Sequence, residues 1–280
     1  MSLGFHNGEF IALDQKIIPI DERGHQFGDG VYELIKVYKG APFMMREHLV
    51  RLEKSAKAIR LQLNYSIDQL EAIIADGLHR AGLAGQDAEV YIQSTRGIAT
   101  RLHTFPNVEA STTMTFRPAR VIPAELRERG VAITLAVDER WANCYIKSLN
   151  LLPNILAKQA AVDNGYYEAV FFRDGYITEG SSTNVYAVKD GTLYTPPATK
   201  RILHGITRHA VLRLARELNI PVVEEEFTPD FLSSGDEIFI SSTTIEVLPV
   251  TTIEGQPVGN GQPGPITRRL YDAVIADATR

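Results

Sequence analysis

Lys147 is the first candidate for a reactive residue, because it lies between apolar side chains. Ile146 precedes it and Leu149 follows it closely, whereas a solvated lysine usually lies among polar residues. An amine in apolar surroundings loses its proton more readily and can attack a carbonyl carbon to form a Schiff base. The same sequence also fits a lysine whose stem packs inside while its ammonium group reaches water. Other parts of the chain must decide between these interpretations.

A carboxylate and two anion-binding segments are the next candidates. Glu179 ends a strand-like segment and is followed by a glycine and small hydroxyl residues. Ile206 and Thr207 follow a glycine at the start of an amphipathic helical pattern, where free backbone N–H groups attract an anion. Residues 241–244 form a hydroxyl run that suits phosphate oxygens. Each segment alone is more typical of a polar turn or an ordinary helix cap.

A loop supplies two further side chains, Arg101 and His103, which could bind a carboxylate or could simply be solvated. Together with Lys147, Glu179 and the two anion-binding segments, they form a recognisable set. Pyridoxal phosphate requires an amine for its aldehyde, an acidic partner for its ring nitrogen and donors for its phosphate. The set therefore indicates a pyridoxal 5'-phosphate site.

Composition limits the class of protein. The chain has 280 residues and a formal net charge of -5, so nothing indicates a nucleic-acid or membrane surface. Its apolar runs are too short to span a bilayer, and we see no signal peptide. The single cysteine, Cys144, excludes an intrachain disulfide and a cysteine-based metal site. We therefore expect a cytoplasmic protein with no metal, nucleic-acid or membrane partner.

Helices and strands alternate along the chain in a way that predicts an α/β (α+β) fold of two domains. We expect a smaller N-terminal domain over 1–117, a linker over 118–130 and a larger domain over 131–280 that carries Lys147. Strands are predicted over 31–38, 88–95, 112–116, 131–137, 140–147, 237–241 and 247–253. Helices are predicted over 47–60, 66–82, 151–161 and 207–218, with a last helix from about residue 266.

Seven motifs, in order along nearly the whole chain, resemble those of a known family. They are RGHQFGDGVYELIKVY (23–38), HLVRL (48–52), RGIATRLH (96–103), IKSLNLLPNILAKQ (146–159), TEGSSTNVY (178–186), ILHGITR (202–208) and SSTT (241–244). As a set they resemble the class IV, fold-type IV pyridoxal-phosphate aminotransferases, most closely those that act on D-amino acids. This resemblance implies two α/β domains with the cofactor in the interdomain cleft.

The resemblance also implies a role for each matching position. Lys147 would form the Schiff base and move the substrate proton, Glu179 would pair with the ring nitrogen, and Leu203 would pack against the ring. Phosphate would be bound by Arg51, Ile206, Thr207, Ser242 and Thr243. The substrate carboxylate would be bound by Tyr32, Arg101 and His103. In the D-amino acid enzymes that arginine and histidine come from the neighbouring subunit, which implies a homodimer.

We therefore expect transamination between a D-amino acid resembling D-alanine and a 2-oxo acid such as 2-oxoglutarate or pyruvate. Alternatives on the same fold are a branched-chain L-amino acid aminotransferase, an aminodeoxychorismate lyase, an (R)-amine transaminase and a non-catalytic binding or scaffold protein. Branched-chain enzymes usually carry an arginine where this chain has Lys36, and they lack the arrangement of Arg101 and His103. Both differences favour a D-amino acid substrate.

Overall fold

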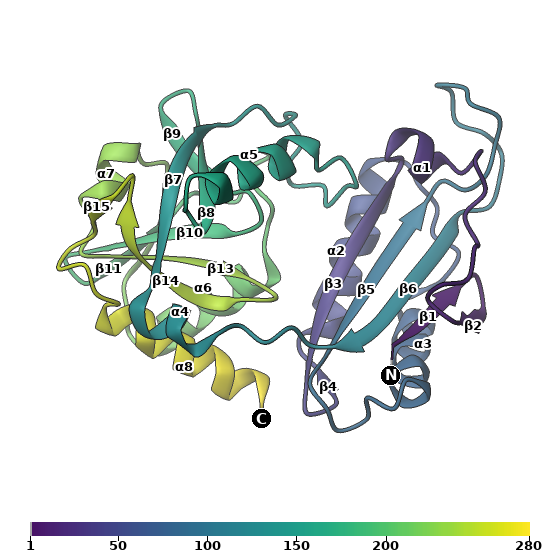
Figure 1. Ribbon diagram of the computed structural model, residues 1–280, viewed down its shortest axis with the longest axis horizontal. Helices are drawn as coiled ribbons and strands as arrows, with labels where there is room; N and C mark the ends of the chain where they lie inside the picture. The colour runs from purple at the N-terminus through teal and green to yellow at the C-terminus, as the bar shows by residue number, and fades with distance from the viewer. Residues whose placement is uncertain (1) are drawn as a thin grey trace. The chain divides into compact units, whose positions relative to one another are not determined.

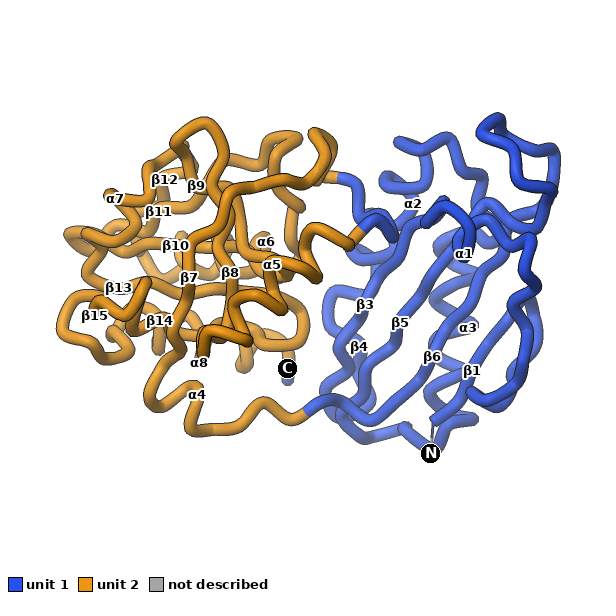
Figure 2. Tube along the Cα trace, turned by 45° about the horizontal axis from the view of Figure 1, so that its top comes forward, with its two compact units in different colours: residues 1–120, 146–150, 279 blue, residues 121–145, 151–278, 280 orange. Residues whose placement is uncertain are grey.

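The computed structural model describes residues 2–280, which form two compact units (Figure 2). Unit 1 comprises residues up to 120 together with 146–150 and 279, and unit 2 comprises 121–145, 151–278 and 280. We expected Lys147 in the C-terminal domain, but its stretch packs with unit 1. The reason is a pair of main-chain hydrogen bonds: Tyr32 N donates to Lys147 O at 3.0 Å, and Leu149 N donates to Gly30 O at 3.1 Å.

Unit 1 is built on a six-stranded sheet in the order β2-β1-β6-β5-β3-β4, with every neighbouring pair antiparallel (Figure 1). Its strands are β1 (Leu3–His6), β2 (Glu9–Ile11), β3 (Gly30–Tyr38), β4 (Ala41–Pro42), β5 (Ala88–Thr95) and β6 (Ser111–Pro118). Its helices are α1 (Arg23–Phe27), α2 (Met45–Ala58) and α3 (Ile67–Arg80).

Local sequence explains where the helices of unit 1 lie. Ser66 caps α3, and its reciprocal hydrogen bonds with Gln69 form a capping box. On α2, Leu49 and Leu52 are fully buried against the sheet. A Cβ on Gly77 of α3 would lie 2.2 Å from Cζ of Phe116, so only glycine permits this close packing of α3 on β6. These contacts pack α2 and α3 against the sheet that contains β3, the strand beside Lys147.

Unit 2 contains a nine-stranded mixed sheet in the order β12-β11-β10-β13-β14-β7-β8-β9, with β15 paired to β14. Its strands are β7 (Val131–Val137), β8 (Glu168–Arg173), β9 (Tyr176–Gly180), β10 (Asn184–Lys189), β11 (Thr192–Thr195), β12 (Val222–Glu224), β13 (Glu237–Ser242), β14 (Glu246–Ile253) and β15 (Gln256–Pro257). Its helices are α4 (Ala124–Arg129), α5 (Leu152–Asp163), α6 (Ile206–Glu217), α7 (Pro229–Ser233) and α8 (Pro265–Ala278).

Helices α6 and α8 share one buried cluster with strands β10, β13 and β14. Val211 of α6 and Val274 of α8 meet Tyr186, Phe239 and Val247 there. The rings of Tyr186 and Phe239 stack with their centroids 4.3 Å apart. This core fixes the first turn of α6 relative to the ends of β10 and β13, which are the segments expected to bind an anion.

Most of the predicted elements are confirmed within a residue or two, but one expectation about local structure, the strand over 140–147, was wrong. Residues 140–147 form a turn-rich loop rather than a strand, because Cys144 and Ile146 are buried without pairing to a neighbouring strand. The stretch expected as a linker contains α4, which belongs to unit 2. None of the helices in residues 2–280 combines the length and apolar character that a membrane span requires. The same residues contain no cluster of side chains suited to a metal ion.

Candidate active site

Lys147 is held against β3 and helix α2 by its main chain. Its N–H donates to Ser55 Oγ at 3.2 Å, and its carbonyl accepts from Tyr32 N at 3.0 Å. Its neighbour Ser148 forms an isolated bridge with Val31. The backbone is therefore fixed on both sides while the half-buried side chain extends from it. Lys147 Nζ lies 4.2 Å from the centroid of the Tyr32 ring, so two of the predicted site residues meet here.

Arg51, expected to bind phosphate, is fixed by a carboxylate that the sequence did not reveal. Glu33 is fully buried and accepts from Arg51 Nε at 2.7 Å and Nη2 at 2.9 Å. His48 Nδ1 lies 2.7 Å from the same carboxylate. Burial by itself would raise the pKa of Glu33, but Arg51 and His48 outweigh it and hold that pKa at about 2. An ionised Glu33 thus orients the guanidinium.

The spacing of His48 and Arg51 was the available signal for this arrangement. Three residues apart on α2, they share a helix face, which is the face that packs on β3. His48 is 2% exposed, and burial lowers its pKa despite the nearby Glu33 carboxylate. The strand partner Glu33 could not be chosen from the sequence, because its burial depends on how α2 lies on the sheet.

Glu179, the predicted partner of a ring nitrogen, lies in unit 2 at the end of β9. It is 4% exposed and accepts hydrogen bonds from Arg140 Nη1 at 2.6 Å and Asn184 Nδ2 at 3.1 Å. The main-chain N–H of Leu203 donates to it at 3.0 Å, which brings two predicted cofactor-binding residues into contact. Burial raises the pKa of Glu179 to about 7, against the opposing effect of Arg140.

A second carboxylate, Asp138, holds Arg140 in place. Asp138 accepts from Arg140 Nε at 2.9 Å and Nη2 at 2.8 Å, in a bidentate pair. Arg173 Nη2 lies 3.0 Å from Asp138, and Thr178 Oγ1 donates to it at 3.0 Å. Asp138 and Arg140 were not identified from the sequence, although two acidic residues followed by an arginine are visible at 138–140. Charges alternate from the half-buried Arg173 to Asp138, Arg140 and Glu179.

The predicted anion-binding residues lie at the first turn of α6 and at the end of β13. Gly205 rather than Thr207 occupies the cap position, and no side chain caps the helix. The first N–H groups of α6 therefore remain available to an anion. A Cβ on Gly205 would lie 2.1 Å from Asn184 Oδ1, so this close approach needs glycine. Asn184 pairs in register with Ser241, beside the predicted ligands Ser242 and Thr243.

Arg101 and His103 lie on the loop that follows β5, and both are exposed. The structure brings them together around one ring: Arg101 Cζ is 4.6 Å from the centroid of Phe27, and the ring of His103 is 5.7 Å from it. Tyr32, the third predicted carboxylate ligand, contacts Lys147. Phe27 was not identified from the sequence.

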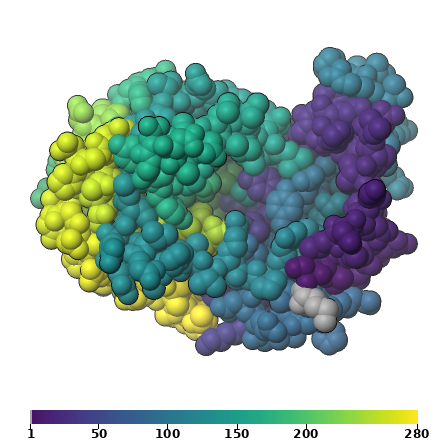
Figure 3. Space-filling view, in the orientation of Figure 1, coloured from purple at the N-terminus to yellow at the C-terminus, as the bar shows by residue number. Residues whose placement is uncertain are grey.

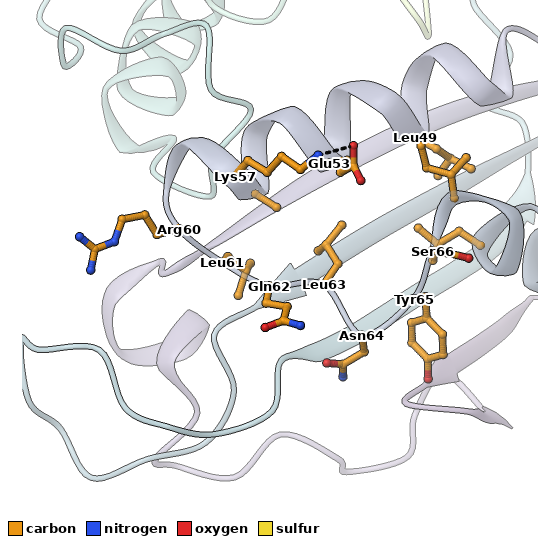
Figure 4. A pocket seen from close by; sticks show the side chains of 13 residues that line it. Leu49, Glu53, Lys57, Arg60, Leu61, Gln62, Leu63, Asn64, Tyr65 and Ser66 are labelled. Atoms are coloured by element: carbon orange, nitrogen blue, oxygen red, sulfur yellow. Dashed lines mark ion pairs between the residues drawn. The ribbon is translucent and has the colours of Figure 1, made fainter.

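Unit 1 also carries a groove of about 530 Å³ (Figure 4). It runs along α2 and the connection from α2 to α3, with Glu53 and Lys57 paired on its rim. None of its lining residues is a predicted catalytic, cofactor-binding or substrate-binding residue. The groove therefore contributes nothing to the candidate site.

Comparisons with a family model, with related sequences and with solved structures all give the same family. The family model for amino-transferase class IV matches residues 30–253. The D-alanine aminotransferase of Staphylococcus aureus (strain COL) is 43% identical over 269 residues, covering 96% of this chain and 95% of that protein. The D-alanine aminotransferase of Bacillus licheniformis is 41% identical over 273 residues, covering 96% of this chain and 94% of that protein.

Solved structures agree on the fold. The branched-chain amino acid aminotransferase of Escherichia coli has a TM-score of 0.91 and 31% identity, covering 98% of this chain and 93% of that chain. A T.th. branched-chain amino acid aminotransferase in complex with N-(5'-phosphopyridoxyl)-L-glutamate has a TM-score of 0.90 and 28% identity, covering 99% of this chain and 94% of that chain. Since family, relatives and fold agree over nearly the whole length, the chain belongs to the class IV aminotransferases.

Proposed function

We propose that this chain transfers an amino group between a D-amino acid resembling D-alanine and a 2-oxo acid, with pyridoxal 5'-phosphate as its cofactor. The observation that carries the proposal is the amine of Lys147, fixed through its main chain and placed over the Tyr32 ring. The D-alanine aminotransferase relatives, 41% identical or more over nearly the whole chain, support the substrate class. The chain is an aminotransferase of the D-amino acid type.

The donors present in the two units fit pyridoxal phosphate. When bound, this cofactor supplies an aldehyde and an electron-withdrawing ring. The amine of Lys147 suits the aldehyde. The buried Glu179 suits a protonated ring nitrogen, because a cationic partner stabilises the ionised form of a carboxyl whose pKa burial has raised. Phosphate would be bound by the uncapped start of α6, at Ile206 and Thr207, by Ser242 and Thr243, and by the cationic Arg51.

Lys147 would carry out the proton transfer, and Leu203 would pack against the cofactor ring. Lys147 Nζ would take the proton from Cα of the amino acid and return it during transfer, as a general base and then a general acid. Its main-chain anchors on Ser55 and Tyr32 fix where the side chain starts, so only the side-chain torsions need to change. Leu203, held by its N–H on Glu179, would lie against the ring.

We further propose that Arg101 and His103 bind the substrate carboxylate and that they do so in a homodimer. Their exposure on a loop of unit 1 supports a role toward a second copy. Helix α5 also presents an outward apolar face, with Leu152 66%, Ile155 59% and Leu156 62% exposed. Such a face is typical of a surface that is covered in an assembly. We also propose that the protein is cytoplasmic, and the single, buried thiol of Cys144 supports this location.

A branched-chain L-amino acid substrate is the second candidate, because similar solved structures are branched-chain aminotransferases. Their identities of 28% to 31% are lower than the 43% of the D-alanine aminotransferase from Staphylococcus aureus, which favours the D-amino acid. The deciding experiment supplies 2-oxoglutarate with D-alanine, L-leucine or an (R)-amine and measures glutamate formation. We expect D-alanine to be the best donor. Activity confined to L-leucine would overturn the substrate and retain the transamination.

A further inference from the structure

An exposed loop on unit 1 carries the two side chains proposed to bind the substrate carboxylate. Residues 96–110 connect β5 to β6, and Leu102, between Arg101 and His103, is 61% exposed. Figure 3 shows this loop, in blue, beside the purple residues that precede β3. An exposed loop loses conformational entropy when two of its side chains must stay at a fixed spacing. Some part of the fold must therefore hold Arg101 and His103 in place.

The base of the loop is held by one carboxylate, that of Asp29. It accepts from Arg23 Nε at 2.9 Å and from Arg96 at 2.9 and 3.0 Å. Both arginine side chains are buried, at 4% and 7% exposure. Arg23 Nη1 then donates to the carbonyl of Leu102 at 2.7 Å, which ties the middle of the loop to this ion pair. The main chain at the tip is thus fixed.

Arg101 and His103, at the tip of the loop, both contact the ring of Phe27, as does Arg23. The guanidinium carbons of Arg23 and Arg101 lie 4.8 and 4.6 Å from its centroid, and the His103 ring lies 5.7 Å away at 52°. The negative face of an aromatic ring attracts a guanidinium and leaves its N–H groups free to donate in their own plane. Arg101 can therefore rest on Phe27 and still bind a carboxylate.

The backbone that carries Phe27 is held at both ends of α1. Phe27 is the last residue of α1, whose N-terminus is capped by Glu22 accepting from His25 N at 2.7 Å. Gly28 follows with a φ of 64°, a conformation that glycine adopts without strain. The far end of the loop is held by a similar stack, since Phe105 lies 3.7 Å from Arg96 Cζ and 4.9 Å from Arg60 Cζ.

We propose that Phe27 is a positioning residue that sets the spacing of Arg101 and His103 for a substrate carboxylate, with Asp29 holding the base of the loop through Arg23 and Arg96. This inference rests on the proposed function, because it assigns Phe27 an effect on substrate binding. Phe27 acts through the two loop side chains, so its replacement changes substrate affinity more than the rate of the chemical step.

The test compares the holoenzyme with Phe27→Leu, which removes the ring, and with Phe27→Tyr, which keeps it. We expect Phe27→Leu to raise KM for D-alanine and 2-oxoglutarate about fivefold, with kcat within about twofold of the original. Phe27→Tyr should restore the original KM. The matched control is Phe10→Leu, because Phe10 carries the guanidinium of Arg80 at 4.8 Å elsewhere in unit 1. It should leave both KM values unchanged.

A double-mutant cycle with Arg101→Ala identifies the route of the effect. In that background Phe27→Leu should add less to KM than it does alone, because part of its action passes through Arg101. If Arg101→Ala raises KM but Phe27→Leu does not, the inference is wrong and the proposed function stands. If Arg101→Ala leaves KM unchanged, the proposed carboxylate binding fails and the inference fails with it.

Limited trypsin digestion of the same holoenzymes measures the loop independently of turnover. Cleavage after Arg101 should be faster in Phe27→Leu and unchanged in Phe27→Tyr and Phe10→Leu, since the loop loses one anchor. Faster cleavage without a change in KM would reduce Phe27 to a purely structural residue and overturn the inference.

Discussion

Arg140 Nη1 lies 2.6 Å from Oε1 of Glu179, and both side chains are buried. The arginine is 39 residues away in the sequence and is itself held by the bidentate pair with Asp138. One guanidinium does not fully stabilise the buried Glu179 carboxylate in its ionised form, so burial raises its pKa to about 7. A second cationic group at Glu179 would complete its stabilisation.

Replacing the proposed catalytic lysine tests the chemistry directly. We expect Lys147→Ala to reduce transamination by at least about 10³-fold, because a positioned general base contributes rate on that scale. The visible absorbance of the bound cofactor should also change. Lys57→Ala is the matched control, since Lys57 lies on the surface of α2 with its side chain 70% exposed. It should retain full activity, and similar activity in the two variants would exclude Lys147 from the mechanism.

The raised pKa of Glu179 predicts a pH-dependent stability of the apoprotein. Between pH 4.5 and 7 the folded protein binds more protons at Glu179 than the unfolded chain does. The free energy of unfolding should therefore fall as pH rises through this interval, by up to about 3 kcal/mol at 1.36 kcal/mol per pKa unit. Urea unfolding at several pH values, with Glu179→Gln as the reference, measures this. A difference between the two proteins that stays constant across the interval would contradict the prediction.

Glu33 should show the opposite pH dependence. Its pKa is lowered to about 2, so its contribution to stability is present above pH 4.5 and is lost as pH falls toward 2. At pH 7 we expect Glu33→Gln to lower the free energy of unfolding by about 3 kcal/mol, because Arg51 loses a buried partner. Glu53→Gln is the control. Glu53 pairs with Lys57 at an exposed position, and such pairs contribute less than about 1 kcal/mol. Equal losses in the two variants would contradict the buried ion pair.

Arg140 should act on the cofactor through Glu179. Arg140→Lys keeps the positive charge but loses the bidentate pair with Asp138. We expect the dissociation constant of the apoprotein for pyridoxal phosphate to rise roughly tenfold, corresponding to about one charge-assisted hydrogen bond. Fluorescence titration measures it. Arg213→Lys, which alters an arginine on the surface of α6, should leave it unchanged. Tight binding retained in Arg140→Lys would show that lysine holds Glu179 equally well.

Much of the local structure could be read from the sequence because its causes are local. The box of Ser66 and Gln69 and the apolar periodicity of α2 and α6 depend on residues within a few positions of one another. The strand over 131–137 was predicted with the same bounds because its β-branched alternation is its own signal. The order of the motifs, which identified the family, is likewise a property of the sequence.

The tertiary structure alone decided which charges meet. Glu33 contacts Arg51, Glu179 contacts Arg140, and Phe27 contacts Arg101 only when helices and loops pack on the sheets. Nothing in the local sequence of Lys147 places it beside Tyr32, because that contact arises from pairing with a distant strand. Side-chain types and their order are properties of the sequence. Burial and partner choice depend on residues far apart in the chain, and these set the pKa of Glu179 and the position of Arg101.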